Sequence, residues 1–253
     1  MQYTLSIEPA APVVTIHRRL LAAFGTPFPA LRLDPLSQLV LGLVNVRTRD
    51  EVAQVAFENL LLAFKGWDRL QYAASDDLEP IITKVAFPEK KAVTLPAALR
   101  AITARRGRLT LDFLEELPTD AARAWLKDIP SVGPKTSASV LNSSTLERRA
   151  LVVDTQHQRV AKRLGLTPPQ GSDEKIAAEL DGQMPAIWTA EDISDHHRLM
   201  KQLGQTHCRP KAPSCSSCPL LSLCPTGQSR HIRPTRRIPR DDGTQPAYAA
   251  LSP

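Results

Sequence analysis

Residues 126–141 read LKDIPSVGPKTSASVL and place a short turn between two amphipathic helical segments, which predicts a helix-hairpin-helix. Gly133 is expected to allow a backbone conformation that most residues with side chains avoid, and Pro134 suits the first position of the second helix. The free amides at the start of that helix would bind an anion such as a DNA phosphate. Ordinary helix–helix turns share this pattern, so the stretch alone leaves both interpretations open.

On both sides of this stretch, apolar residues recur at three-and-four spacing and no segment alternates with period two. This pattern predicts an all-α protein of about ten helices. The expected helix starts are Asp34 with Pro35, Asp50, Thr119, Asp154 and a capping box at Thr189 and Asp192, and the expected ends are Gly107 and Gly165.

The four cysteines of the chain, Cys208, Cys215, Cys218 and Cys224, follow the spacing C-x6-C-x2-C-x5-C. One shared metal centre explains this clustering better than disulfides, because a chain of 253 residues can bury a core without them. A structural zinc site usually has two short cysteine hooks, and only Cys215 and Cys218 form one. The wider spacing favours an iron–sulfur cluster and leaves zinc as the alternative.

The net charge of +6 is concentrated near the cysteines, since residues 205–240 contain seven Lys or Arg and no acid. Such a basic segment indicates a polyanionic partner, most simply nucleic acid, although a solubilising tail has the same composition. The chain has no long apolar run and does not open with an export signal, so we expect a soluble cytoplasmic protein that does not bind membranes.

Two residues are candidates for catalysis. Lys135 falls in the first turn of the second hairpin helix, where the helix dipole would lower the pKa of its amine and favour a nucleophile. Asp154 lies in LVVDTQHQRVAKRLGL, residues 151–166, at a predicted helix start. Most exposed lysines are only solvated charges, and an aspartate there is commonly an ordinary N-cap.

The hairpin, the segment around Asp154 and the cysteine spacing together resemble, in the same order, the three motifs of the endonuclease III family of DNA glycosylases. The resemblance covers roughly residues 15–225. It implies a [4Fe-4S] cluster and two helical lobes with a DNA-binding cleft between them. The implied organisation is the N-terminal part of the cluster lobe in 1–33, a central lobe with the hairpin in 34–148, the rest of the cluster lobe in 149–225, and a basic, flexible tail in 226–253.

The resemblance also implies an activity. Lys135 matches the amine nucleophile of the family, and Asp154 matches its catalytic carboxylate. The protein is then expected to be a monomeric, nucleoid-associated DNA glycosylase and AP lyase of base excision repair. Its expected substrate is double-stranded DNA with a damaged base, in particular an oxidised pyrimidine, or with an abasic site, which it would nick by β-elimination.

The implied DNA contacts come from the hairpin, from the loop between the first two cysteines and from two sites that would fill the gap left by a flipped base. These residues are Val132, Gly133 and Thr136, then Arg209 and Lys211, then Arg47 and Phe87. For Phe87, a place in the hydrophobic core is the competing interpretation.

The sequence departs from the family pattern at several positions. Ser131 replaces the first glycine of the hairpin, which costs on the order of 1 kcal/mol if its φ is positive. Pro134 has no amide to offer a phosphate. Gln156 stands where the family often has histidine, and Arg47 replaces a glutamine.

These departures leave alternatives open. The same fold could act on uracil, a mismatched thymine or another modified base, or mainly on abasic sites. A noncatalytic DNA-binding module would also use the hairpin and cluster, but it would have no use for a buried amine at Lys135.

Overall fold

The computed structural model describes residues 12–28 and 31–232 of the chain. The predicted all-α class is confirmed, because the described residues form helices and no strands apart from one isolated bridge between Leu33 and Ser144. None of the described helices has the length and apolar character needed to cross a membrane.

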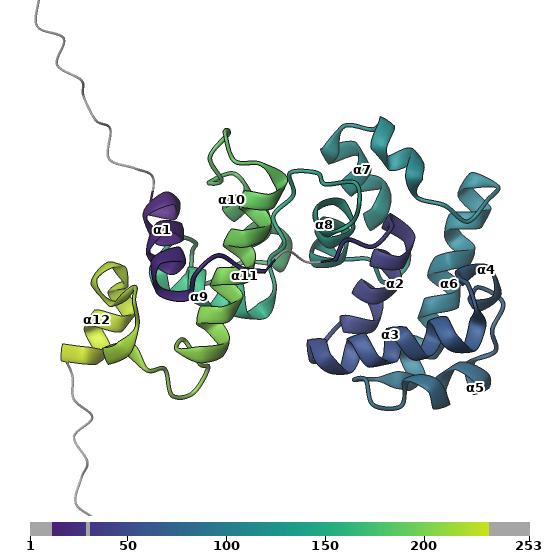
Figure 1. The fold of residues 1–253 in the computed structure, drawn as a ribbon, viewed down its shortest axis with the longest axis horizontal. Coiled ribbons are helices and arrows are strands. Elements are labelled where there is room, and N and C mark those ends of the chain that lie inside the picture. Colours follow the sequence, from purple (N-terminus) through teal and green to yellow (C-terminus); the bar gives the residue numbers. More distant parts are fainter. Residues whose placement is uncertain (1–11, 29–30, 233–253) are drawn as a thin grey trace, which may run out of the picture.

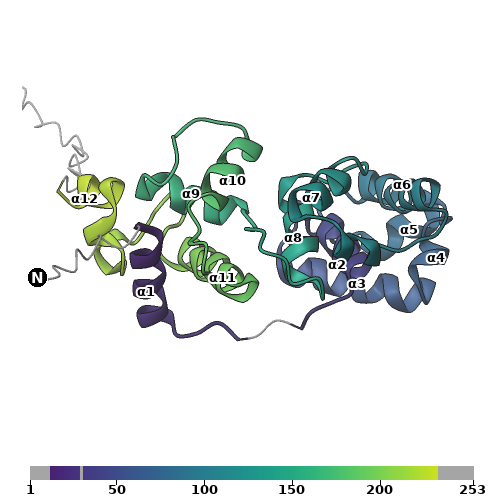
Figure 2. The same ribbon diagram turned by 90° about the horizontal axis from the view of Figure 1, so that it is seen from above.

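The helices form two groups that lie side by side, each around its own hydrophobic core (Figures 1 and 2). The first group, which we call the central lobe, consists of α2 (Pro35–Asn45), α3 (Asp50–Phe64), α4 (Trp67–Leu70), α5 (Ser75–Leu78), η1 (Glu79–Ile82), α6 (Pro88–Arg106), η2 (Asp112–Glu116), α7 (Thr119–Lys127) and α8 (Pro134–Ser143). Its core includes Leu39, Leu60, Leu99, Leu126 and Val140.

The second group, the cluster lobe, combines both ends of the described chain. It consists of α1 (Pro12–Phe24), α9 (Thr155–Leu164), α10 (Asp173–Asp181), α11 (Ala190–Thr206), η3 (Cys215–Ser217), η4 (Leu221–Leu223) and α12 (Pro225–Ile232). Helix α1 buries Val13, Ile16 and Leu20 in the core of this lobe and packs against α11. The N-terminal helix therefore completes a lobe whose other helices follow Asp154.

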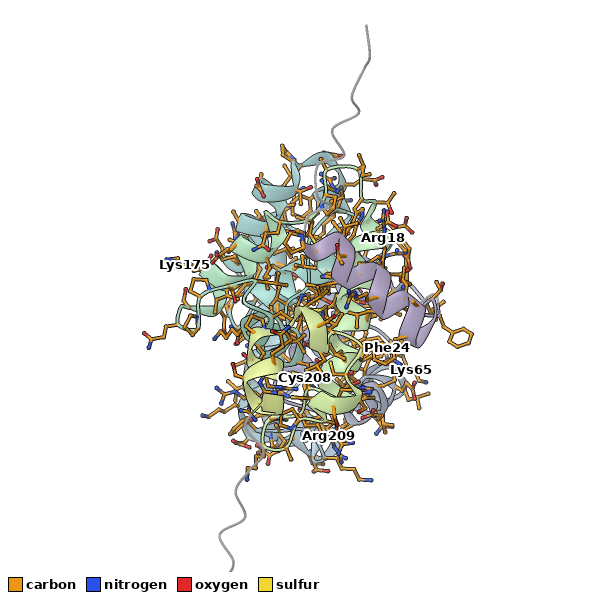
Figure 3. All side chains as sticks on the ribbon, turned by 90° about the vertical axis from the view of Figure 1, so that its left-hand side faces the viewer. Arg18, Phe24, Lys65, Lys175, Cys208 and Arg209 are labelled. Carbon is orange, nitrogen blue, oxygen red and sulfur yellow. The ribbon has the colours of Figure 1, made fainter. Side chains whose placement is uncertain are left out.

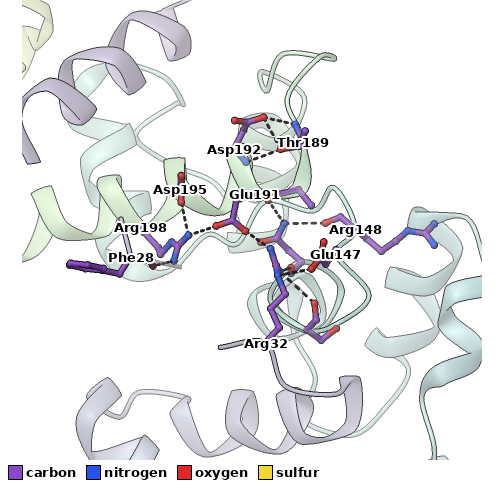
Figure 4. A network of polar contacts seen from close by, with 12 residues as sticks. Phe28, Arg32, Glu147, Arg148, Thr189, Glu191, Asp192, Asp195 and Arg198 are labelled. Atoms are coloured by element: carbon purple, nitrogen blue, oxygen red, sulfur yellow. Dashed lines mark hydrogen bonds and ion pairs between the residues drawn. The ribbon is translucent and has the colours of Figure 1, made fainter. Parts of the chain in front are cut away.

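Arg32 ties the segment between α1 and α2 to both lobes (Figure 4). Its Nε lies 2.9 Å from Glu147 Oε1, and its Nη1 donates to the carbonyl of Asn142 at 2.7 Å. The guanidinium also pairs with Glu191 of α11, which accepts a hydrogen bond from Arg198 at 2.5 Å. Because Asn142 belongs to α8 and Glu191 to α11, this network fixes the two lobes relative to each other.

Local capping follows most of the predictions. Asp34 accepts hydrogen bonds at the start of α2, the capping box at Thr189 is present, and Gly107 and Gly165 end their helices in the left-handed conformation. The predicted caps Asp50 and Thr119 are wrong by one position, because both are the first residues of their helices. Asp50 instead uses its carboxylate in the site described below.

The predicted flexible tail after Cys224 is wrong for its first residues. Residues 225–232 form α12, which packs against α9, η3 and η4. Gly227 is buried there, and a Cβ at this position would lie 3.2 Å from a methyl of Leu221. This packing supplies the order that the composition alone did not indicate. Residues 233–253 of the predicted tail lie outside the described part of the chain.

The hairpin turn between α7 and α8 differs from the expectation for Gly133. Gly133 has φ −99° and ψ −175°, an extended conformation that any residue adopts, whereas Ser131 has φ +66°. The left-handed position of the turn therefore falls on Ser131, where a side chain is strained.

Replacing Ser131 by glycine should stabilise the protein by up to about 1 kcal/mol, since relief of the left-handed strain outweighs the added flexibility of the unfolded chain. The matched variant Gly133→Ala should leave stability unchanged or raise it slightly, because a Cβ there meets nothing within 4 Å. The free energy of unfolding of both variants, measured in urea, tests which residue of the turn has positive φ. If Gly133→Ala lowers the stability and Ser131→Gly does not raise it, the described conformation of the turn, with positive φ at Ser131 and an extended Gly133, is wrong.

Candidate functional site

Lys135 points from the first turn of α8 to the junction of the lobes, where its Nζ donates to Asn45 Oδ1 at 2.5 Å. Burial lowers the pKa of the Lys135 amine; Asp154 and Asp50 oppose this lowering, and Lys201 adds to it. The direction agrees with the sequence prediction, but burial replaces the helix dipole as the main cause. The amine therefore loses its proton more readily than an exposed lysine does.

Asp154 precedes α9 and serves as its N-cap, because its Oδ1 accepts from the amide of His157 at 2.8 Å. The residue is only 8% exposed, and its Oδ2 lies 3.8 Å from Lys201 Nζ. Burial acts to raise the pKa of Asp154, but His197, the His157 hydrogen bond and Lys201 outweigh burial and lower it. The carboxyl is therefore ionised while it caps the helix.

Three further residues connect Lys135 with Asp154, and the sequence prediction missed all of them. Asn45, at the end of α2, donates its Nδ2 to Asp50 Oδ1 at 2.9 Å while it accepts from Lys135. Asp50 pairs in turn with Lys201 of α11. A continuous series of polar contacts thus runs from Lys135 through Asn45, Asp50 and Lys201 to Asp154. No local sequence pattern indicates this series, because Asp50 and Lys201 lie 151 residues apart in the chain.

Behind Asp154 lie three histidines of the cluster lobe, of which His157 and His196 are fully buried and His197 is half-buried. The rings of His157 and His197 stack, with their Nδ1 atoms 3.3 Å apart, and His196 contacts His157 edge to face. Burial is the main cause that lowers the pKa of His157 to about 3 and of His197 to about 4, and it also lowers the pKa of His196. His157 is thus a core residue, and Gln156 packs against Gly204 of α11.

In the hairpin, the side chains of Val132 and Thr136 are buried. Val132 is buried, and its amide donates to the carbonyl of Ile129 at 3.1 Å. The Thr136 side chain packs against Gly42, where an added Cβ would lie 3.0 Å from its methyl. The amides of Gly133, Lys135 and Thr136 find no acceptor in the described part of the chain. Free amides at a helix N-terminus can bind an anion.

Arg47 and Phe87 lie together on neighbouring loops, and both have positive φ, +56° and +57°. Phe87 is 45% exposed, so the interpretation of this residue as part of the core is wrong. The Arg47 guanidinium carbon lies 5.8 Å from the Phe87 ring centroid. Thr48 joins the two loops, since its Oγ1 accepts from the amide of Ala86 at 3.0 Å and from Lys91 Nζ at 2.9 Å.

The four cysteines line a single hollow of about 340 Å³ of empty volume, a figure that includes space open to solvent. Helix α12 and the end of α9 border this hollow, and Cys208 and Arg209 lie next to each other at the outer end of the cluster lobe (Figure 3). Arg163 Nη1 donates to Cys208 Sγ and the Gly227 amide donates to Cys224 Sγ, each at 3.2 Å.

These surroundings suit a positively charged group held by thiolates. Burial raises the pKa of the Cys218 and Cys224 thiols, so their thiolates need a positive partner. Hydrogen bonds to sulfur, such as those from Arg163 and Gly227, are typical around iron–sulfur clusters. Among the described residues, no three His, Cys, Asp or Glu side chains are arranged to hold one metal ion.

Arg209 and Lys211 are exposed on the loop between α11 and η3. Arg159 and Arg163 of α9 hold the backbone of this loop. Arg159 Nε donates to the carbonyl of Cys208 at 2.9 Å, and Arg163 Nη1 donates to the carbonyl of Arg209 at 2.8 Å. The helix that begins after Asp154 therefore also fixes the basic loop.

Comparison with known proteins gives consistent matches. A family model described as "HhH-GPD superfamily base excision DNA repair protein" matches residues 42–185. Endonuclease III of Bacillus subtilis is 30% identical over 198 residues, which cover 78% of this chain and 84% of that protein. Endonuclease III of Thermotoga maritima is 30% identical over 192 residues, covering 76% and 83%.

Among solved structures, a non-covalent endonuclease III–DNA complex shares the fold. The TM-score is 0.71 at 24% sequence identity, and the match covers 87% of this chain and 97% of the other. Both lobes are therefore included in the structural likeness.

Because the pKa values of these three histidines are lowered, we expect the protein to lose stability in mild acid. In the unfolded chain each histidine binds a proton as the pH falls below about 6.5, whereas the lowered pKa keeps the folded form neutral down to about pH 4. Each such residue then removes up to about 1.4 kcal/mol of stability per pH unit.

His196→Leu removes one of these groups. Between about pH 6.5 and pH 5, the free energy of unfolding of this variant in urea should therefore fall less steeply than that of the wild type, by up to about 1.4 kcal/mol per pH unit. Above about pH 7.5 the two proteins should show parallel dependence on pH. Equal slopes in the acid range would show that His196 is already protonated in the folded protein.

Proposed function

Because the chain belongs to the HhH-GPD superfamily of base excision DNA repair proteins and is an endonuclease III-like DNA glycosylase, we propose that it removes oxidised pyrimidines from duplex DNA and then cuts the strand at the abasic site. The observation that carries this proposal is the half-buried amine of Lys135, whose lowered pKa favours the uncharged form and which shares its site with the ionised Asp154. A protein that only bound DNA would gain nothing from burying a lysine.

In the proposed reaction, the uncharged Lys135 amine attacks C1′ of the deoxyribose, and the base leaves with the electrons of the glycosidic bond. The resulting amine–sugar adduct opens to a Schiff base, loses a proton from C2′, and expels the 3′ phosphate by β-elimination. Asp154 stabilises the positive charge on the sugar while the glycosidic bond breaks, and it transfers the protons of the later steps. Burial supports both roles, because it strengthens this interaction and lowers the pKa of Lys135.

We propose three DNA contacts around this chemistry. The amides of Gly133, Lys135 and Thr136 bind a backbone phosphate, without help from the side chain of Thr136. The fixed basic loop with Arg209 and Lys211 binds a second region of the backbone. Arg47 and Phe87 fill the gap left by the extruded base, which their exposure and mutual contact support.

The four cysteines are proposed to hold a [4Fe-4S] cluster. Its contribution at this position would be structural, because the hollow lies against the basic loop and α12, far along α9 from Asp154. Ligation would fix the loop that carries Arg209 and Lys211, in addition to the hydrogen bonds from Arg163.

The identity of the removed base is the part of the proposal that depends most on this chain's own residues. Arg47 stands in place of a glutamine at the gap-filling position, and Gln156 packs on α11. A panel of duplexes, each with one lesion, tests the preference directly. Faster release of uracil or of a mismatched thymine than of any oxidised pyrimidine would replace the proposed substrate with that base.

Borohydride added during turnover on DNA with an abasic site should trap a covalent complex with the wild-type protein and not with Lys135→Ala. Asp154→Asn should slow base release by a factor of about a hundred or more while damaged DNA still binds, because the charge is lost. Asparagine caps helices nearly as well as aspartate, so thermal unfolding should change little. Trapping by Lys135→Ala at the wild-type rate would place the nucleophile elsewhere.

The protein purified without added metal should be brown and contain about four irons per chain. Cys215→Ser should lower both the iron content and the stability of the cluster lobe, since cluster binding and folding of the loop are coupled. Ser217→Ala, at an exposed position of the same turn, serves as the control and should retain full iron. One zinc per chain in a colourless sample kept from oxidants would contradict the cluster.

A further inference from the structure

Lys201 is a second amine in the site, and it belongs to the opposite lobe from Lys135. From α11 its amine pairs with Asp50 at the start of α3, and its Nζ lies 3.8 Å from Asp154 Oδ2. The side chain is 22% exposed, so most of it is removed from solvent. One amine therefore bridges the two carboxylates of the site.

The same two carboxylates also act on Lys135. Asp154 and Asp50 are the two acids that favour the protonated form of its amine, and Asn45 links Lys135 to Asp50 by two hydrogen bonds in series. The charged and titratable groups around Lys135 are Asp50, Lys91, Asp154, His197 and Lys201. In this set only Asp50 and Asp154 carry negative charge.

Two arrangements of charge are possible in the site. Either Lys135 and Lys201 are both protonated and each balances one carboxylate, or Lys201 alone is protonated and interacts with both Asp50 and Asp154. If Lys201 were absent, Asp50 and Asp154 would face the amine of Lys135 without their own partner and would hold its proton. A protonated lysine cannot attack C1′, since its lone pair is occupied. The position of Lys201 removes this conflict, because it offers its own charge to both carboxylates.

We propose that Lys201 is a positioning residue that engages Asp50 and Asp154 across the two lobes and so leaves Lys135 as the uncharged nucleophile. This inference rests on the proposed role of Lys135 in the reaction. It assigns Lys201 an effect on the charge state of the nucleophile and not a contact with the reacting sugar.

Two other roles for Lys201 give different results in the same experiment. If Lys201 is a strut, meaning that its ion pair with Asp50 only holds α3 and α11 together, it affects nothing but the alignment of the lobes. As a phosphate ligand, it would matter for the salt dependence of DNA binding. Lys127 provides a matched control for a purely structural role. It pairs with Glu174 across the same two lobes, between α7 and α10, and neither residue is among the charges that shift the pKa of Lys135.

The test is the pH dependence of single-turnover borohydride trapping at saturating abasic-site DNA, for the wild type, Lys201→Met, Lys201→Arg and Lys127→Met. In Lys201→Met the midpoint of the rise should move upward by about one pH unit or more, so that trapping is about tenfold slower near neutral pH and recovers in base. Lys201→Arg and Lys127→Met should keep the wild-type midpoint.

A second measurement does not need activity. Lysines of the full-length protein are methylated with ¹³C-formaldehyde and titrated by NMR, with the Lys135 signal assigned by its loss in Lys135→Arg. The pKa of Lys135 should rise in Lys201→Met and should keep its wild-type value in Lys201→Arg. Urea unfolding shows which variants are folded.

An unchanged midpoint in Lys201→Met overturns the inference, and so does an unchanged pKa of Lys135. A uniform fall in rate at every pH, shared with Lys127→Met, identifies a strut. A flatter salt slope of binding with an unmoved midpoint identifies a phosphate contact. If the wild type does not trap at all, the proposed function fails, and the NMR titration still decides the role of Lys201.

Discussion

The site depends on keeping charged groups away from water at the junction of two lobes. A buried carboxylate or amine is tolerated only with partners, because desolvation costs several kcal/mol for each ion. Asp154 meets this requirement through a helix N-terminus, and Lys135 through Asn45. Both are also linked through Lys201, which comes from the lobe opposite to Lys135. The relative position of the lobes therefore sets the electrostatics of the site, and Arg32 helps to hold that position.

Helix α9 connects the two functional regions of the cluster lobe. Asp154 caps its first turn, Arg159 and Arg163 on later turns hold the loop that contains Cys208, and its end borders the hollow lined by the four cysteines. A change at the four cysteines would reach the basic loop directly, because Arg163 contacts both Cys208 and Arg209. Its effect on Asp154 would pass along a single rigid helix.

Features that depend on neighbouring residues could be predicted from the sequence. The helical periodicity, the caps at Asp34 and Thr189, and the glycine that ends α9 are local, and the structure confirms them. The role of Asp50 could not be predicted, since its partner Lys201 lies 151 residues away. Helix α12 was missed because its order comes from packing on α9 and not from its own composition.

The cluster lobe takes its first helix from the N-terminal end of the described chain, whereas residues 35–143 of the central lobe are contiguous. During synthesis the central lobe can fold as soon as it has emerged, while α1 has to wait for α11 to supply the surface that covers Leu20. Lys135 is thus presented early, on a folded lobe, and its partners from α9 and α11 arrive last. A nascent chain that stops before α11 carries Lys135 together with Asp50 and Asp154, but it lacks the Lys201 amine that pairs with both carboxylates.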